Sequence, residues 1–241
     1  MKEIAAIAVL TALPALALGD APAATDATIV DGDVHRVIVD NEHVRVFDAR
    51  AARGMKSPMH THPPLVLVSI GQARFRLGRP DGTQAVFDLN PGQVLWSGQG
   101  TEHSWELLVG DLHAIGVEIK SAQGPGAPPA AATRDGGDST IADPEAHHVL
   151  FENEHVRVFE GRTSHGRRSP MHSHPPSLLV SQDWIRLKLT LADGKTAIHD
   201  FHPGQVLWLP EGGRHSWEAI AGSGRVIAIE VKSARRAPHA D

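Results

Sequence analysis

A long internal repeat is the feature that most restricts the folds open to this chain. Residues 41–47 return at 153–159, and residues 57–64 return almost unchanged at 169–176, in both cases 112 positions later. Solenoid repeats are much shorter, at ~20–50 residues per unit. A period of this length therefore indicates a duplicated domain, and a chain of 241 residues has room for two such domains.

The N-terminus has the pattern of an export signal. Lys2 precedes an apolar run at residues 4–18, and small residues then offer cleavage after Gly19 or after Ala23. The run is shorter than the ~20 residues that a membrane-spanning helix needs, so an uncleaved anchor is the less favoured alternative. We interpret residues 1–23 as a signal peptide and expect a periplasmic or secreted protein.

Composition marks the boundary between the two copies. The stretch that separates them is rich in glycine, proline and alanine and has no apolar period, which is typical of a linker. We expect the first domain at residues 30–122, the linker at 123–142 and the second domain at 143–236.

Charge and cysteine content exclude several classes of function. Lysine and arginine number 23 against 28 aspartate and glutamate, so the net charge is −5, and no basic run is present. Nucleic acid is therefore excluded as the expected partner. The absence of cysteine rules out disulfides, thiolate metal ligands and a cysteine nucleophile. Any bound metal must be held by nitrogen and oxygen atoms.

Each copy has the sequence pattern of an all-β domain. Pro80–Gly82 and Ala192–Gly194 are predicted hairpin turns, because glycine supplies the positive φ that such turns require. No ten-residue helical stripe occurs within a copy. Many short strands with turns between them predict an antiparallel sandwich or a small barrel. In the first copy the expected strands cover residues 44–47, 65–68, 73–77, 94–96 and 115–119.

Three histidines recur at matching positions in both copies. His60 and His62 are two residues apart on a predicted strand, so their imidazoles project from one face. His103 follows about forty residues later on another predicted strand. Neutral imidazoles from two strands can bind one side of a divalent cation and leave the other side open. The predicted metal ligands are His60, His62, His103, His172, His174 and His215.

The remaining histidines are expected to have other roles. The chain contains sixteen histidines, so some coincidences of spacing are expected. His43 and His155 also recur, but they lie outside the predicted triads and are assigned a structural role. We expect the others on the surface or in turns: His35, His113, His147, His148, His165, His199, His202 and His239.

The spacing around these histidines resembles the two motifs of the cupin superfamily. Gly166, His172 and His174 have the spacing of the first motif, and Gly204 and His215 have that of the second. The first copy matches at the same spacings. The chain therefore resembles a bicupin, which implies two tandem jelly-roll β-barrels joined by the Pro/Gly-rich linker. Because cupins include enzymes, storage proteins and regulators, the resemblance is specific for the fold and not for an activity.

One departure from the family pattern affects the predicted sites. The first cupin motif usually carries a glutamate, a few residues after the second histidine, as a fourth metal ligand. Val66 and Leu67 stand at those positions in the first copy, and Leu178 and Leu179 stand there in the second. By this resemblance, both sites are three-histidine sites.

The carboxylates near the third histidine do not replace the missing ligand. Strand alternation places Glu106 on the face opposite His103, and Glu218 lies in the same position in the second copy. Trp105 and Trp217 share the histidine face, where filling the core is their expected role. No catalytic base is identified from the sequence.

Arginines that recur in both copies are expected to make ion pairs. Arg74 and Arg186 lie on a middle strand, where they could pair across strands with Glu118 and Glu230. An arginine directed inward would instead bind a substrate carboxylate in a bidentate way.

The sequence favours a secreted, metal-binding bicupin. Three neutral ligands leave a divalent ion its full charge, which favours a small anionic substrate. The leading hypothesis is non-haem iron dioxygenase-type activity, which some members of the superfamily have, with Fe(II) as the favoured cofactor and zinc, manganese or nickel as alternatives. Two other functions stay open: a non-catalytic, metal-dependent protein that binds a small molecule or carbohydrate, and a metal-free structural barrel. No membrane partner is expected after signal cleavage, and homodimer formation is left open.

Overall fold

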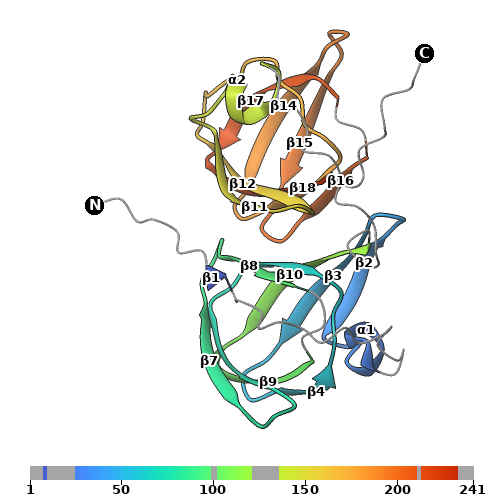
Figure 1. Ribbon diagram of the computed structural model, residues 1–241. Helices are drawn as coiled ribbons and strands as arrows, with labels where there is room; N and C mark the ends of the chain where they lie inside the picture. Colours follow the sequence, from blue (N-terminus) through green and yellow to red (C-terminus); the bar gives the residue numbers. More distant parts are fainter. Residues whose placement is uncertain (1–7, 10–24, 99–101, 121–135, 211–212, 233–241) are drawn as a thin grey trace, which may run out of the picture. The chain divides into compact units, whose positions relative to one another are not determined.

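The chain folds into two compact units, Met1–Pro125 (unit 1) and Gly126–Asp241 (unit 2). The computed structural model describes residues 8–9, 25–98, 102–120, 136–210 and 213–232. Figure 1 shows unit 1 in blue to green and unit 2 in yellow to red, and each is built almost wholly of strands. The predicted cleavage sites and most of the predicted linker lie outside the described residues. Within the described part, no helix is long and apolar enough to cross a membrane.

Unit 1 consists of two sheets. In the larger sheet the strand order is β1-β8-β5-β10-β3-β2, and all pairs are antiparallel except that of β1 with β8. The smaller sheet has the order β4-β9-β6-β7. The strands of the larger sheet are β1 (Ala8–Val9), β2 (His35–Asp40), β3 (Val44–Ala51), β5 (Leu65–Ser69), β8 (Val94–Ser97) and β10 (Leu112–Ile119). Those of the smaller sheet are β4 (Lys56–His60), β6 (Ala73–Gly78), β7 (Gln84–Leu89) and β9 (His103–Gly110).

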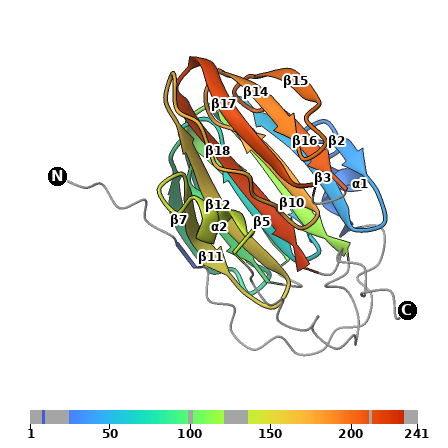
Figure 2. The ribbon, with the colours of Figure 1, turned by 90° about the horizontal axis from the view of Figure 1, so that it is seen from above.

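Unit 2 repeats this arrangement except that no strand corresponds to β1 or β4 among its described residues. Its larger sheet has the order β11-β12-β18-β13-β16, and its smaller sheet has the order β15-β14-β17. Figure 2 shows β12 and β18 side by side, in agreement with their antiparallel register. The strands are β11 (His147–Glu152), β12 (Val156–Thr163), β13 (Ser177–Ser181), β14 (Ile185–Leu191), β15 (Thr196–Phe201), β16 (Val206–Leu209), β17 (His215–Gly222) and β18 (Gly224–Val231).

The predicted all-β fold of two tandem jelly-roll barrels is confirmed, and every strand expected in the first copy is present. Both predicted hairpin turns carry glycines with positive φ, 80° at Gly82 and 83° at Gly194. The core of unit 1 joins its two sheets, because Ala51 from β3 packs with Trp105 and Leu107 from β9. The predicted strand through both His60 and His62 is only partly correct. β4 ends at His60, since Pro63 and Pro64 follow and proline cannot donate to a ladder.

A single helical turn precedes the first long strand of each unit. α1 (Ala27–Val30) is capped by Asp26, whose side chain accepts a hydrogen bond from the Thr28 amide. α2 (Ser139–Ala142) is capped in the same way by Asp138. The turn of α1 is attached to the motif that carries His60 and His62, because the Ala27 amide donates to the Thr61 carbonyl over 3.2 Å.

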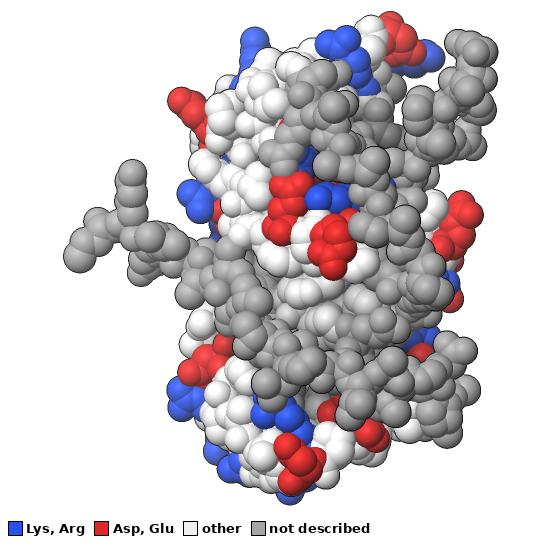
Figure 3. All heavy atoms as spheres, viewed as in Figure 1, with Lys and Arg blue, Asp and Glu red and all other residues white. Residues whose placement is uncertain are grey.

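Charge is mixed on the surface. On the face shown in Figure 3, the described lysine and arginine side chains lie among aspartate and glutamate side chains.

Candidate metal centre

The three histidines predicted in the first copy gather in space. The ring centroids of His60 and His62 are 5.0 Å apart, and those of His60 and His103 are 4.5 Å apart. The motif segment brings the first two rings together, and the first residue of β9 supplies the third. In unit 2 the corresponding separations are 4.9 Å between His172 and His174 and 4.6 Å between His172 and His215.

A fourth histidine joins each group, so the expectation that His35 and His147 are surface or turn residues is wrong. His35 is 5% exposed, and its ring centroid lies 5.1 Å from that of His60. His147 is 6% exposed, at 4.9 Å from His172. We call the two groups cluster 1 and cluster 2. Cluster 1 comprises His35, His60, His62 and His103, and cluster 2 comprises His147, His172, His174 and His215.

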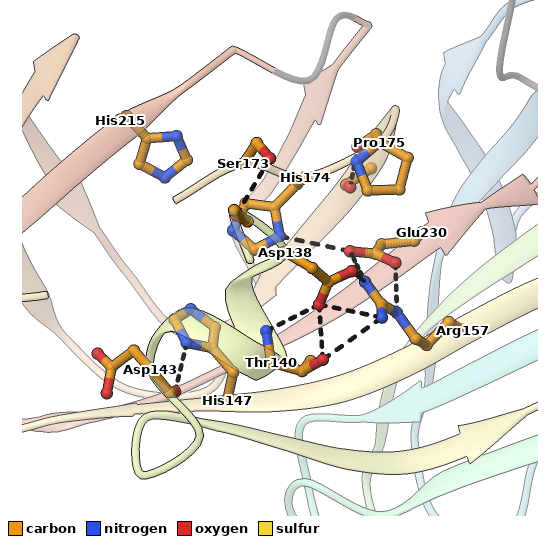
Figure 4. A network of polar contacts seen from close by, with 12 residues as sticks. Asp138, Thr140, Asp143, His147, Arg157, Ser173, His174, Pro175, His215 and Glu230 are labelled. Atoms are coloured by element: carbon orange, nitrogen blue, oxygen red, sulfur yellow. Dashed lines mark hydrogen bonds and ion pairs between the residues drawn. The ribbon is translucent and has the colours of Figure 1, made fainter. Parts of the chain in front are cut away.

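The new histidine places a ligand atom close to those of the motif pair. One ligand atom from each of His35, His60 and His62 lies within 4.8 Å of the others, and the same holds for His147, His172 and His174. Figure 4 labels three rings of cluster 2: His147 from the start of β11, His174 from the motif segment and His215 from the start of β17. The histidine cluster is therefore wider than three histidines on two strands would make it.

Hydrogen bonds at Nδ1 orient most of these rings. His60 Nδ1 lies 2.9 Å from the Pro58 carbonyl oxygen, and His35 Nδ1 lies 3.1 Å from that of Asp31. A carbonyl oxygen can only accept, so Nδ1 carries the proton and Nε2 keeps its lone pair. His147, His172 and His215 are held in the same way by the carbonyl oxygens of Asp143, Pro170 and Gly213.

The Nε2 atoms of His60 and His172 are buried and have no hydrogen-bond partner among the described residues. Buried polar atoms are rarely left unpaired, so each such atom requires an explanation. A metal ion bound at Nε2 supplies one, because a ligating histidine normally donates its other ring N–H to a carbonyl or carboxylate. The donor set thus fits a divalent ion.

Burial keeps the rings of His35, His60, His147 and His172 neutral. It lowers the pKa of His35 and of His60 to about 4, and the positive charge that His62 would carry lowers both further. In unit 2, burial lowers the pKa of His147 to about 4 and that of His172 to about 3. At neutral pH these four imidazoles therefore carry no second proton that would compete with a cation.

A buried ionic network stands behind the second motif histidine of each unit. His62 Nδ1 lies 2.9 Å from Glu118 Oε1, and Glu118 also accepts a hydrogen bond from Arg45. Arg45 in turn bonds Asp26 over 2.6 Å, so the cap of α1 belongs to the same network. The network carries two carboxylates against one guanidinium. Burial raises the pKa of Glu118, and the Arg45 guanidinium opposes that rise.

Unit 2 has the same network with a more deeply buried arginine. Arg157 is 2% exposed and bonds both carboxylate oxygens of Glu230, at 2.6 and 2.8 Å. Figure 4 shows Arg157 between Glu230 and Asp138, with Glu230 directed toward His174. The distance from His174 Nδ1 to Glu230 Oε1 is 3.4 Å, longer than its counterpart in unit 1.

The predicted partners of these glutamates are wrong. Arg74 pairs with Asp88 on the outer surface, and Arg186 pairs with Asp200 in the same way. The strand register explains this, because Arg74 lies opposite Asp88 on β7, whereas Glu118 lies opposite Arg45 on β3. No inward arginine is free for a substrate carboxylate in these two networks.

The expected orientation of Glu106 is confirmed. Its carboxylate bonds Arg76 over 2.7 Å on the outer face, and Glu218 bonds Arg168 over 2.8 Å. Trp105 and Trp217 are buried on the inner face, as expected.

Cluster 2 opens into a cavity of about 230 Å³ between the two sheets of unit 2. Its four histidines all line the cavity, and most other lining side chains are apolar, including Phe159 and Trp217. Among the described lining residues there is no carboxylate and no lysine. The cavity is smaller than the ~300–1,000 Å³ typical of drug-sized ligands, so it suits a small molecule.

Comparison with solved structures identifies the fold as that of cupins. A "Cupin 2 conserved barrel domain protein" from Leptotrichia buccalis matches with a TM-score of 0.52 at 15% identity, over 82% of this chain and 88% of that chain. A mutant of salicylate 1,2-dioxygenase from Pseudoaminobacter salicylatoxidans gives 0.55 at 10% identity, over 80% and 71%. A mutant of Bacillus subtilis oxalate decarboxylase gives 0.50 at 15%, over 82% and 71%. No family model and no curated protein matches the sequence.

These similarities show the fold and leave activity open, since identity is low. The chain is a two-domain protein of the cupin fold, with one histidine cluster in each domain.

Proposed function

We propose that each unit binds one divalent metal ion through the Nε2 atoms of its four clustered histidines. The observation that carries this proposal is the buried, unpartnered Nε2 of His60 and of His172 among other neutral imidazoles. The fourth position, which a glutamate usually occupies in the family, is taken by His35 in unit 1 and by His147 in unit 2. Glu118 is not itself a ligand in this proposal; its carboxylate accepts the hydrogen bond from Nδ1 of His62.

We further propose that the ion is ferrous iron and that the reaction is of dioxygenase type. Imidazole donors suit iron, and equally zinc, copper and nickel. Bound iron would supply the redox chemistry with dioxygen. Four histidines would hold the ion and leave room beside it for a small anionic substrate and dioxygen. A dioxygenase among the similar structures agrees with this proposal without testing it.

The residues of the chain have defined roles in such a reaction. Carbonyl and carboxylate acceptors fix the rings at Nδ1, so the site is ordered before the ion arrives. The carboxylate behind His62 makes that ring a stronger donor. Apolar walls exclude water from the reacting groups, which strengthens the attraction between the cation and an anionic substrate.

One observation favours a second candidate, a metal-dependent binding protein without catalysis. The described cavity lining of unit 2 offers no carboxylate or lysine that could accept a proton. Glu230 is fully buried, and both its oxygens are already bonded to Arg157. A reaction in this cavity would therefore proceed without a general base from the protein.

Metal analysis of the natively purified protein tests both proposals. We expect up to two divalent ions per chain, and we expect the double variant His60→Ala, His172→Ala to lose them. His202→Ala, at an exposed histidine outside both clusters, is the matched control and should retain them. Less than a tenth of an equivalent in the wild type would overturn metal binding. An iron signal altered by nitric oxide would support the dioxygenase, whereas zinc alone would favour binding.

Export of the mature protein also remains a proposal, supported by the pattern of residues 1–23. Intact mass of protein expressed with its own N-terminus should show cleavage after Gly19 or after Ala23. A full-length mass in the periplasmic fraction would contradict it.

A further inference from the structure

The wall of the cavity in unit 2 is more apolar than the barrel fold requires. On β14 the residues facing the cavity are Ile185, Leu187, Leu189 and Leu191, which alternate with polar residues on the outer face. Leu207 and Leu209 on β16 face it from the other sheet. Leu191 lies opposite His215 in the ladder of β14 with β17, and Ile185 lies at the other end of β14, so the wall is apolar from the histidines along the whole strand.

The rim is apolar although it is open to solvent. Leu191 is 45% exposed and lines the cavity. A leucine at such a position gains little from folding, because nearly half of its surface stays in water. Contact with a bound apolar molecule would bury that surface.

Unit 1 shows that the fold accepts polar residues at these places. At the same distance in the repeat, Arg79 corresponds to Leu191, Ser97 corresponds to Leu209, and Ala73 corresponds to Ile185. Arg79 follows directly after β6, and Ser97 ends β8, so both occupy the equivalent ends of strands. The apolar rim is therefore a property of unit 2 and not of the barrel.

The same wall argues against a carbohydrate. Apart from the four histidines, Arg162 and Thr163 are the described lining residues with a charged or hydroxyl-bearing side chain. The Arg162 guanidinium is already paired with Glu160. A sugar placed here would bury several hydroxyl groups without partners, which disfavours its binding.

We propose that unit 2 binds small monocarboxylates with an apolar body, with the carboxylate at the histidine end and the body along β14 and β16. The contact with the carboxylate rests on the proposed function, because four neutral imidazoles leave a divalent ion its full positive charge and this charge attracts the carboxylate. The preference for an apolar body is inferred from the composition of the wall alone. Unit 1, with Arg79 and Ser97, has a different preference.

Titration of acetate and hexanoate tests this inference. Both carry the same carboxylate, and hexanoate adds four CH₂ groups, each worth about a factor of four in affinity when fully buried. The protein is the full chain with His60→Ala and His103→Ala, so that only unit 2 is active, loaded with Co²⁺. Isothermal titration calorimetry gives both dissociation constants, and metal analysis gives the occupancy.

The expected result is hexanoate binding at least ~10-fold tighter than acetate. The double variant Leu191→Ser, Leu209→Ser should reduce that preference to about twofold or less in protein that metal analysis shows to be loaded with Co²⁺. Ile198→Ser is the matched control, because Ile198 is 62% exposed and does not line the cavity. It should keep the full preference.

Two failures can be told apart. Stoichiometric Co²⁺ with equal affinities for both acids, or with a preference that survives the rim variant, overturns the inference and leaves the metal site intact. Failure to bind Co²⁺ overturns the metal proposal, and the proposed head-group contact fails with it. Tighter binding of glucose than of hexanoate would also overturn the inference and favour a carbohydrate.

Discussion

Replacement of Glu118 by glutamine should weaken metal binding in unit 1 without unfolding it. Glu118 is fully buried, and its Oε1 lies 2.9 Å from His62 Nδ1. Glutamine has the same shape and keeps an oxygen that can accept the N–H of His62, but it removes the negative charge behind the ring. Removal of such a partner of a metal-ligating histidine typically costs ~10–100-fold in metal affinity, which is about 1.4–2.7 kcal/mol.

The assay requires a chain with a single working site. In the background His172→Ala, His215→Ala, zinc affinity is measured by competition with a chromophoric chelator, before and after Glu118→Gln. Glu106→Gln is the matched control, because the same charge is lost from the outer face of the same unit, where Glu106 bonds Arg76. An unchanged affinity in a folded Glu118→Gln variant would refute the reasoning that the buried carboxylate strengthens the site.

Three further results are expected. Arg157→Leu should lower the free energy of unfolding of unit 2, measured in urea, by about 3–5 kcal/mol, because it leaves buried carboxylates unpaired. Arg186→Leu, which removes an exposed ion pair, should leave that free energy unchanged. Gly116→Ala should cost about 1–3 kcal/mol by calorimetry, since a Cβ there would lie 2.1 Å from the Phe47 ring; an unchanged stability would contradict the packing. Removal of metal by a chelator should lower the melting temperature. The loss corresponds to ~2.7 kcal/mol of unfolding free energy if the free metal concentration had been 100-fold above its Kd. An unchanged melting temperature would contradict metal binding to the folded state.

The repeat predicted most of the fold and six of the eight clustered histidines. His60 and His172 were found because a motif of known spacing surrounds them. The sequence also contained the signal for the two that were missed, since His35 and His147 are separated by the same 112 positions. His35 has no second histidine nearby, and His147 is followed only by His148, which has no counterpart in the first copy, so recurrence was the available clue.

Tertiary contacts explain why the rest could not be predicted. His35 reaches the cluster because α1 docks on the motif segment, through the Ala27 amide and the Thr61 carbonyl. The network from Asp26 to Glu118 joins residues from both ends of unit 1, and strand register decides that Arg45 is the partner. Neither the docking nor the register can be derived from local pattern.

The number of imidazoles around the ion tests the central claim most directly. X-ray absorption spectroscopy of the zinc-loaded wild type and of the double variant His35→Ala, His147→Ala measures it in each. The account predicts about four imidazole ligands per ion in the wild type and about three in the variant. Three in both proteins would contradict the assignment of His35 and His147 as metal ligands.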